Sequence, residues 1–364
     1  MLVYVGTYAK YPPQARGRAE GIYAFRLDPA TGALEHAHTV AEVVNPSFLA
    51  LAPGGRHLYA VNEALETDGQ PGGAVSAFAV DPATGALTFL NKQGSHGADP
   101  CHLSVDATGQ VVVVANYTSG SVALFPIESD GSLAPASDVH QHVGASGVNP
   151  RRQEGPHAHM APIDAANRLV LVPDLGRDEV RLYDLDLANH ALRPHTPEAV
   201  AFAPGAGPRH LTFHPAAPYA YVIGELGCTI AACRWDAAAG TLEPFQTVPT
   251  LPADFSGEST CADIHVAPSG RFVYGSNRGH DSIVTYAIDA ATGGLTFVGH
   301  TPTGGRTPRN FAIDPSGTFL FAANQNTDTI VTFRLDPASG LPVPTGRVTP
   351  VPSPVCLLIA PELG

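Results

Sequence analysis

Apolar and polar residues alternate along this chain in short stretches that recur at similar intervals. Each stretch is rich in branched and aromatic side chains, runs into a turn and ends on a leucine. Alternation of this kind is typical of a β-strand with one buried face, and Pro- and Gly-containing turns are typical of hairpins. Seven copies occur, at 22–34, 75–87, 122–133, 180–192, 230–242, 283–295 and 330–341. Their leucines lie about 50 residues apart, close to the length of a propeller blade.

A second pattern, a strand, a Pro/Gly turn and another strand, lies between these copies. It occurs at 45–63, 99–117, 155–174, 207–225, 259–278 and 307–325. The two patterns together give four antiparallel strands per unit, here called A, B, C and D. A last A strand lies at 353–361, and the B strand that it lacks is at 2–8, the other end of the chain. Pairing these two strands would close a ring.

The chain is therefore predicted to be all-β, a single seven-bladed β-propeller domain over 1–364. Each blade would have four antiparallel strands, and the last blade would combine the N-terminal and C-terminal strands. A miscounted unit would give six or eight blades instead. The 37 glycines and 34 prolines suit the many turns of this architecture.

Net charge and cysteine content indicate which kinds of partner the protein binds and in which cellular compartment it lies. The formal net charge of −13 leaves no basic stripe for nucleic acid, so any anion site must be a local group of arginines. No apolar stretch is long enough to span a membrane, and the N-terminus does not have the composition of a signal peptide. Five scattered cysteines do not suggest a disulfide framework. We expect a cytoplasmic protein, a monomer or a dimer, that binds neither nucleic acid nor membrane.

Comparison between blades separates residues that serve every blade from residues that serve one site. Asn recurs at the end of strand B, at Asn62, Asn116, Asn277 and Asn324, which suggests a structural role. The next position varies and carries charge at Glu63, Asp174, Glu225 and Arg278. The start of strand A carries charge or imidazole at His157, Arg209 and Arg309. Antiparallel pairing places these two positions at the same end of the ring, so the side chains are predicted to converge on one mouth of the channel.

This group of charged residues has two interpretations. Charges of both signs near a shared axis form a candidate active site, with His157, Glu225, Arg209 and Arg278 as catalytic residues and Glu63, His159, Asp174 and Arg309 as substrate-binding residues. The alternative is a ring of ion pairs that fastens neighbouring blades.

His157 and His159 lie on one face of a strand, and with Asp174 as a third ligand they could hold zinc. Nearby arginines would oppose a cation, so we predict no metal and assign His157 to catalysis. No nucleophile elbow, Walker loop or dinucleotide motif occurs, so we expect acid–base chemistry on a small molecule without a cofactor.

Several segments resemble one known family. They are RRQEGPHAH (151–159), VPDLGRDEV (172–180), GPRHLTFHP (207–215), VIGEL (222–226), SNRGHDSI (276–283), NYTSGSVALF (116–125) and the terminal VYVGTY. They are similar to the propeller-type 6-phosphogluconolactonases, which are related to 3-carboxy-cis,cis-muconate lactonizing enzymes. The resemblance covers nearly the whole chain and implies a seven-bladed propeller and a lactonase without a metal. It places the site on His157, Arg209, Glu225 and Arg278, and matches Arg152 and Gln153 to the family's RQ segment.

The predicted reaction is hydrolysis of a lactone, an intramolecular ester. His157 would act as general base and acid, with Glu225 as its partner or as the group that positions water. Arg209 or Arg278 would stabilise the oxyanion, and Arg152 or Arg309 would hold a carboxylate or phosphate. Two alternatives remain open: a cycloisomerase that forms a lactone from an unsaturated diacid, and a non-catalytic propeller that binds a protein partner.

Overall fold

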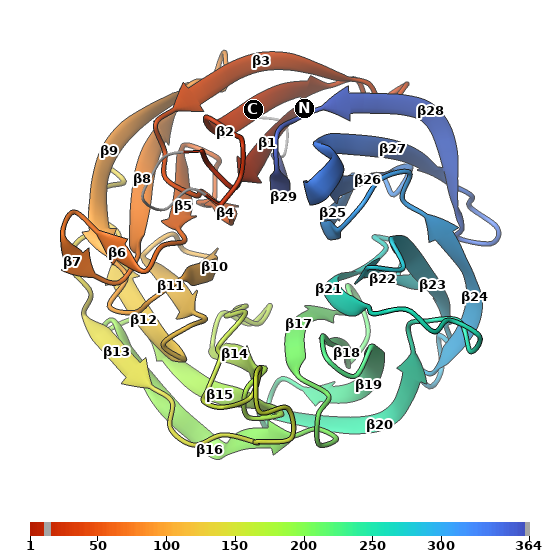
Figure 1. Cartoon of the computed structure of the whole chain (residues 1–364). Helices are drawn as coiled ribbons and strands as arrows, with labels where there is room; N and C mark the ends of the chain where they lie inside the picture. The colour runs from red at the N-terminus through yellow and green to blue at the C-terminus, as the bar shows by residue number, and fades with distance from the viewer. Residues whose placement is uncertain (11–15, 361–364) are drawn as a thin grey trace.

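A ring of β-sheets surrounds the axis of the predicted central channel in the computed structural model, which describes residues 1–10 and 16–360 (Figure 1). The blades follow one another in sequence order around the ring, and one strand of each lies beside the channel while another forms the rim. Within the described residues, six of the seven blade sheets have four strands in antiparallel order. The predicted seven-bladed propeller is confirmed.

The blades are numbered here from the first complete unit and their strands are given from the channel outward. Blades 1 and 2 comprise β4 (Leu49–Leu51), β5 (His57–Asn62), β8 (Ala74–Val80) and β9 (Leu87–Gly94), then β10 (Pro100–Val105), β11 (Val111–Asn116), β12 (Ser121–Pro126) and β13 (Asp138–Gln141). Blade 3 comprises β14 (Leu169–Asp174), β15 (Glu179–Asp186) and β16 (Ala191–Ala201). Blade 4 comprises β17 (Pro208–Phe213), β18 (Tyr219–Gly224), β19 (Thr229–Asp236) and β20 (Thr241–Pro249).

Blades 5, 6 and 7 complete the ring. Blade 5 comprises β21 (Thr260–Val266), β22 (Phe272–Arg278), β23 (Ser282–Ile288) and β24 (Leu295–Pro302). Blade 6 comprises β25 (Pro308–Ile313), β26 (Phe319–Asn324), β27 (Thr329–Leu335) and β28 (Pro342–Pro350). Blade 7 comprises β29 (Pro354–Ala360), β1 (Leu2–Thr7), β2 (Gly21–Leu27) and β3 (Leu34–Ala41). A short hairpin of β6 (Glu66–Thr67) and β7 (Gln70–Pro71) and a 3₁₀ turn, η1 (Gln325–Thr327), lie in the connections.

Blade 3 departs from the predicted four strands. The segment that should form its inner strand pairs with β14 only through isolated bridges, Ala158 with Asp174 and Ile163 with Val170. Proline explains part of this irregularity, because Pro162 lies inside the segment and has no N–H to donate. The segment carries His157 and His159, so two candidate site residues lie on an irregular backbone.

Blade 7 is closed by the two ends of the chain, as predicted. β1 and β29 are antiparallel, and Leu2 lies opposite Ala360 while Gly6 lies opposite Cys356. The two strands lie side by side at the channel (Figure 1). This pairing gives the edge of β1 a partner and leaves the ring with no open joint.

The apolar core lies between neighbouring blades. One cluster, for example, joins Leu171 of blade 3 to Val222 and Cys233 of blade 4. Tyrosines add a polar contact: the hydroxyl of Tyr59 donates to the carbonyl of Gly131 in the next blade at 3.0 Å, and Tyr4, Tyr221 and Tyr274 make the equivalent bond. Four of the seven junctions between blades therefore combine apolar burial with a tyrosine hydrogen bond.

The recurring asparagines have the structural role that the repeats predict. Each side-chain amide donates to a carbonyl in the connection that leads into its own blade: Asn62 to Val44, Asn116 to Ser95, Asn277 to Thr250 and Asn324 to Thr303. These bonds fix the loop before each inner strand. In the part of the chain that the structure describes, no helix has both the length and the apolarity needed to cross a membrane.

Candidate active site

A polar cavity of about 380 Å³ lies where the inner strands begin and their neighbours end. Its four arginines and three carboxylates come from different blades or from the loops between them. Its described lining comprises Tyr8, Arg16, Glu63, Asp99, Cys101, Tyr117, Thr118, Arg152, His159, Glu225, Thr260, Arg278 and Arg309. Two larger hollows, of about 530 and 620 Å³, lie elsewhere and gather fewer charged groups. We therefore place the candidate site in the polar cavity.

One wall of the cavity is built on a single carboxylate held by three arginines, here called the Glu225 cluster (Glu225, Arg152, Arg209 and Arg278). Arg152 Nη2 lies 2.6 Å from Glu225 Oε1, and Arg209 Nε and Arg278 Nη2 lie 2.8 and 3.0 Å from Oε2. Arg152 also donates to the Tyr117 hydroxyl, and Arg278 to the carbonyl of Cys261. Three guanidinium groups and one carboxylate leave a formal charge of +2.

Glu225 is buried, and this position would by itself raise its pKa. Arg278, Arg209 and Arg152 outweigh the loss of water and hold the pKa of Glu225 well below its ordinary value. Burial also lowers the pKa of Arg209, to about 10, with Arg278 and Arg309 acting in the same direction. The carboxylate is thus charged at neutral pH and is a weak base.

The opposite wall reverses this pattern: one arginine is held by two carboxylates. Arg16 lies 2.7 Å from Glu63 and also pairs with Asp99. Tyr8 donates to Glu63 at 2.9 Å, and Thr118 donates to Asp99 at 2.7 Å. We call Tyr8, Arg16, Glu63, Asp99 and Thr118 the Arg16 cluster. Its single guanidinium and two carboxylates give a formal charge of −1.

Arg309 is a further cavity arginine and differs from the others. Its guanidinium lies over the Tyr8 ring, 5.4 Å from the centroid. Among the residues that the structure describes, no carboxylate forms an ion pair with it. Burial lowers the pKa of Arg309, but Tyr8, Glu63 and Glu225 more than offset this, so it stays charged. An uncompensated charge in a cavity is a candidate site for an anionic group.

His157 lies beside this cavity and is not part of its lining. Its ring stacks on Tyr117 with centroids 4.6 Å apart. Nδ1 lies 2.9 Å from the Tyr117 carbonyl, and Nε2 lies 3.2 Å from a carboxylate oxygen of Glu154. A carbonyl and a carboxylate both only accept, so each contact is a hydrogen bond when the ring nitrogen involved carries a hydrogen.

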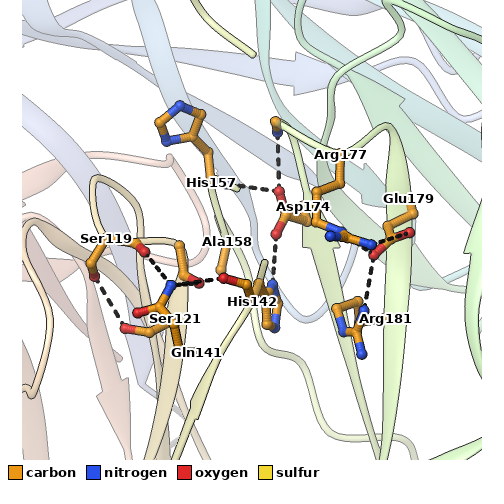
Figure 2. A network of polar contacts seen from close by, with 12 residues as sticks. Ser119, Ser121, Gln141, His142, His157, Ala158, Asp174, Arg177, Glu179 and Arg181 are labelled. Atoms are coloured by element: carbon orange, nitrogen blue, oxygen red, sulfur yellow. Dashed lines mark hydrogen bonds and ion pairs between the residues drawn. The ribbon is translucent and has the colours of Figure 1, made fainter. Parts of the chain in front are cut away.

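Asp174 and Gln153, also predicted to bind substrate, lie outside the described lining of the cavity and hold the chain around it. Asp174 accepts from the backbone N–H groups of His157 and Gly176 and pairs with His142 at 2.6 Å, as Figure 2 shows. Gln153 is fully buried and donates to the Leu175 carbonyl and to Asp178. Both side chains fix the segment that carries His157.

The remaining predicted residues are distributed between the cavity and its floor. Glu63, Arg152, His159, Glu225, Arg278 and Arg309 line the cavity. Arg209 lies beneath it and lines a small hollow of about 10 Å³ together with His159 and Arg309. Apart from His157, Asp174 and Gln153, the predicted residues therefore meet at one mouth.

Arg16 and Asp99 are cavity residues that comparison between blades did not find. Arg16 lies in the loop between β1 and β2, outside every repeat. Asp99 directly precedes the proline that opens β10, where other blades have Asn45, Gly207 or Thr307. Its backbone is left-handed, with φ of 52°, which Asp tolerates better than most residues. A charged residue at a position where other blades have Asn, Gly or Thr could have identified Asp99 as a candidate site residue.

The possible zinc site is not formed in the described part of the chain. No group of three or more His, Cys, Asp or Glu there has an arrangement that could hold a metal ion. His159 Nδ1 instead lies 3.7 Å from the Cys101 sulfur, and burial, followed by Arg209, lowers the pKa of His159 well below its ordinary value. This imidazole is thus neutral and packed. That the protein needs no metal or cofactor stays a prediction.

Comparison with known proteins agrees with this geometry. Residues 2–359 match the family model described as "Lactonase, 7-bladed beta-propeller". The chain is 41% identical to the 6-phosphogluconolactonase of Bacillus subtilis over 308 residues, 85% of this chain and 83% of that protein. It is 34% identical to the 6-phosphogluconolactonase of Formosa agariphila, over 85% of this chain and 86% of that protein.

A solved structure is similar over almost the full length. The periplasmic gluconolactonase of Pseudomonas aeruginosa superposes with a TM-score of 0.90 at 35% identity, covering 98% of this chain and 99% of that one. Sequence and structure thus agree on one group of proteins. The chain belongs to the family of seven-bladed β-propeller lactonases.

Proposed function

We propose that this protein hydrolyses a sugar lactone, and that its substrate is a 6-phosphogluconolactone-like compound. The observation that carries the proposal is the surplus of positive charge at the Glu225 cluster, in a cavity of a size that suits a small molecule. The names of the relatives from B. subtilis and F. agariphila support the same reaction class.

Arg278 and Arg152 would stabilise the transition state. When water attacks the lactone carbonyl, negative charge develops on the carbonyl oxygen. Both guanidinium groups line the cavity and are held by Glu225 before substrate arrives. Donors fixed in advance cost little reorganisation, and one such donor contributes on the order of 3 kcal/mol. Arg209, beneath the cavity, would act by holding Glu225.

Glu225 would orient the attacking water and not deprotonate it, because its depressed pKa makes it a poor base. His157 is the proposed general base and acid, and Nε2 is the nitrogen that would exchange the proton, since the Tyr117 carbonyl engages Nδ1. A proton taken up there would be shared with the Glu154 carboxylate, 3.2 Å away. Because His157 lies outside the described lining, this role requires the substrate or a water to reach past Tyr117.

The two charged walls would orient the sugar. The carboxylates of the Arg16 cluster accept hydrogen bonds, which suits the hydroxyls of a polyol, and the Glu225 cluster suits the ester carbonyl. Arg309, which has no carboxylate partner among the described residues, would bind the phosphate or another anionic group. Glu63 and His159 would complete the binding surface. Asp174 and Gln153 would serve binding by shaping the loop.

A pH-indicator assay tests the proposal, with glucono-δ-lactone and its 6-phosphate as substrates and Arg309→Gln as the comparison variant. Hydrolysis is expected with both, and the variant should lose about tenfold in kcat/KM on the phosphate ester and less on the unphosphorylated lactone. NMR of the product separates hydrolysis from lactone formation. Wild-type protein without activity on either lactone would refute the proposal.

We also propose a cytoplasmic location. The five cysteines are free in the structure, which suits a reducing compartment. The P. aeruginosa relative is described as periplasmic, so the family occurs in more than one compartment. Cell fractionation of the native host decides between the two.

A further inference from the structure

Beneath the cavity, a line of side chains continues from Glu225 along the central channel. Arg209 Nη1 lies 3.2 Å from His210 Nε2, His210 Nδ1 lies 2.8 Å from Asp263 Oδ1, and Asp263 Oδ2 lies 3.0 Å from His265 Nε2. The first four members are almost fully buried, whereas the His265 side chain is 41% exposed. Two blades contribute: blade 4 through β17 and the residue that follows β18, and blade 5 through β21.

The hydrogen positions in this line follow from chemistry. A guanidinium only donates, so His210 Nε2 must accept, and Nδ1 must therefore carry the hydrogen that is donated to Asp263. Burial, followed by the charge of Arg209, lowers the pKa of His210 to about 4, although Asp263 acts in the opposite direction. At neutral pH His210 is thus neutral and present as one tautomer.

Asp263 is surrounded by donors. Besides His210, the backbone N–H of Ile264 points at Oδ1, and the Asn310 amide and the Phe311 N–H point at Oδ2 together with His265. A carboxylate satisfies them all because both of its oxygens accept. An asparagine in place of Asp263 would have an NH2 group where one of the carboxylate oxygens now lies. Its two hydrogens would then face the N–H donors that point at that oxygen.

We propose that Asp263 is a positioning residue: it fixes the tautomer of His210, which aims Arg209 at Glu225. Arg209 and Arg278 share Glu225 Oε2, so a shift of Arg209 would turn the carboxylate and move Arg278 with it. Displacements of this kind cost about 100-fold in rate when they affect groups at the reacting atoms. The proposal rests on the proposed function of the Glu225 cluster.

Asp263→Asn is the direct test. The least obstructed placement of its amide is toward His210, which can change tautomer, and this would turn Nε2–H against the Arg209 guanidinium. We expect kcat to fall 10- to 100-fold with KM within about threefold. Nitrogen NMR of His210 should report the change from the Nδ1–H to the Nε2–H tautomer. An unchanged tautomer, or a changed tautomer with wild-type kcat, overturns the proposal.

Two variants of His210 serve if Asp263→Asn does not fold. His210→Gln has an oxygen that can accept from Arg209 and an amide that can donate to Asp263, so kcat should stay within about fivefold of wild type. His210→Leu has neither group, so its kcat should fall by as much as that of Asp263→Asn. Equal kcat in the two variants would overturn the proposal. Absence of wild-type activity on sugar lactones would instead refute the proposed function. The tautomer measurement would still test whether Asp263 fixes the tautomer of His210.

Discussion

The Glu225 cluster and the Arg16 cluster face the same cavity with inverse charge patterns. In the first, three arginines surround one carboxylate, and in the second, two carboxylates hold one arginine. The first therefore presents hydrogen-bond donors and positive charge, and the second presents acceptors. A cavity divided in this way can orient a molecule that has an ester carbonyl at one end and hydroxyls at the other.

The two clusters also differ in how the fold supports them. Three members of the Glu225 cluster have a rigid support: Glu225 and Arg278 lie at strand ends in the inner half of adjacent blades, and Arg209 is continued by the buried line to Asp263. Arg152 is the exception, because it comes from a loop and its side chain is 36% exposed. Arg16 lies in the loop between β1 and β2, with its side chain 29% exposed. Groups on a rigid, buried support suit transition-state stabilisation, and groups on loops suit recognition. The predictions below test this division of labour.

Glu225→Gln should have the largest effect. The amide keeps the shape but removes the charge that holds three guanidinium groups, so kcat on a sugar lactone should fall about 1,000-fold or more. Steady-state kinetics measures the loss, and thermal unfolding shows whether the protein remains folded. A folded variant with kcat near wild type would mean that the cluster only fastens the blades.

Arg278→Lys should come next, with a loss of about 100-fold in kcat. Lysine keeps the charge but cannot bond Glu225 and the Cys261 carbonyl with the same planar geometry. Arg271→Lys is a matched control, because that arginine is exposed and contacts only a carbonyl and a phenyl ring on the described surface. Equal kcat for both variants would contradict the oxyanion role.

Asp99→Asn should act on recognition and have a smaller effect. One acceptor charge is lost from the Arg16 cluster while the side chain keeps its shape. We expect the ratio of kcat/KM for glucono-δ-lactone to kcat/KM for δ-valerolactone, which has no hydroxyls, to fall about tenfold. If kcat/KM fell equally on both lactones, the Arg16 cluster would not be reading hydroxyl groups.

The smallest effect should be on the pH dependence of stability. The pKa of His210 in the folded protein, about 4, lies below its ordinary value of 6.5. The folded state therefore binds fewer protons than the unfolded state, and the stabilisation is present above pH 6.5 and is lost as the pH falls toward 4. As the pH falls from 6.5 toward 4, the Tm of the wild-type protein should decrease by on the order of 3 °C more than the Tm of His210→Gln. A constant difference would contradict a neutral buried imidazole.

Repetition made most of the fold and half of the site predictable from the sequence. The strand that recurs in each unit predicted the blades, and comparison of equivalent positions found Glu225, Arg278 and Arg309, because charge at a strand end near the channel has to face it. The same comparison placed Asp174 at the mouth. Its carboxylate instead accepts from local N–H groups and from His142, since strand alternation predicts a direction and not a hydrogen-bond partner.

The other half of the site comes from places that repetition does not describe. Arg16 belongs to a loop with no equivalent in other blades, so no pattern relates it to Glu63 and Asp99. The inner segment of blade 3 is irregular, and the ring of His157 turns to Tyr117 and Glu154, next to the cavity but outside its described lining. Loop conformation and side-chain packing set these details.

The pairing of β1 with β29 has a consequence for biosynthesis. Leu2 and Ala360 are neighbours in the finished ring but are far apart in the sequence, so Ala360 is synthesised long after Leu2. Until the last strand leaves the ribosome, β1 has an uncovered edge, and such a long-range contact forms slowly. Tyr8 directly follows β1 and Arg16 lies in the loop before β2, so we expect the Arg16 cluster to be completed only then. A ribosome stalled before β29 would therefore carry a ring that lacks the inner strand of blade 7, and we expect this ring to be inactive and open to strand exchange with its neighbours.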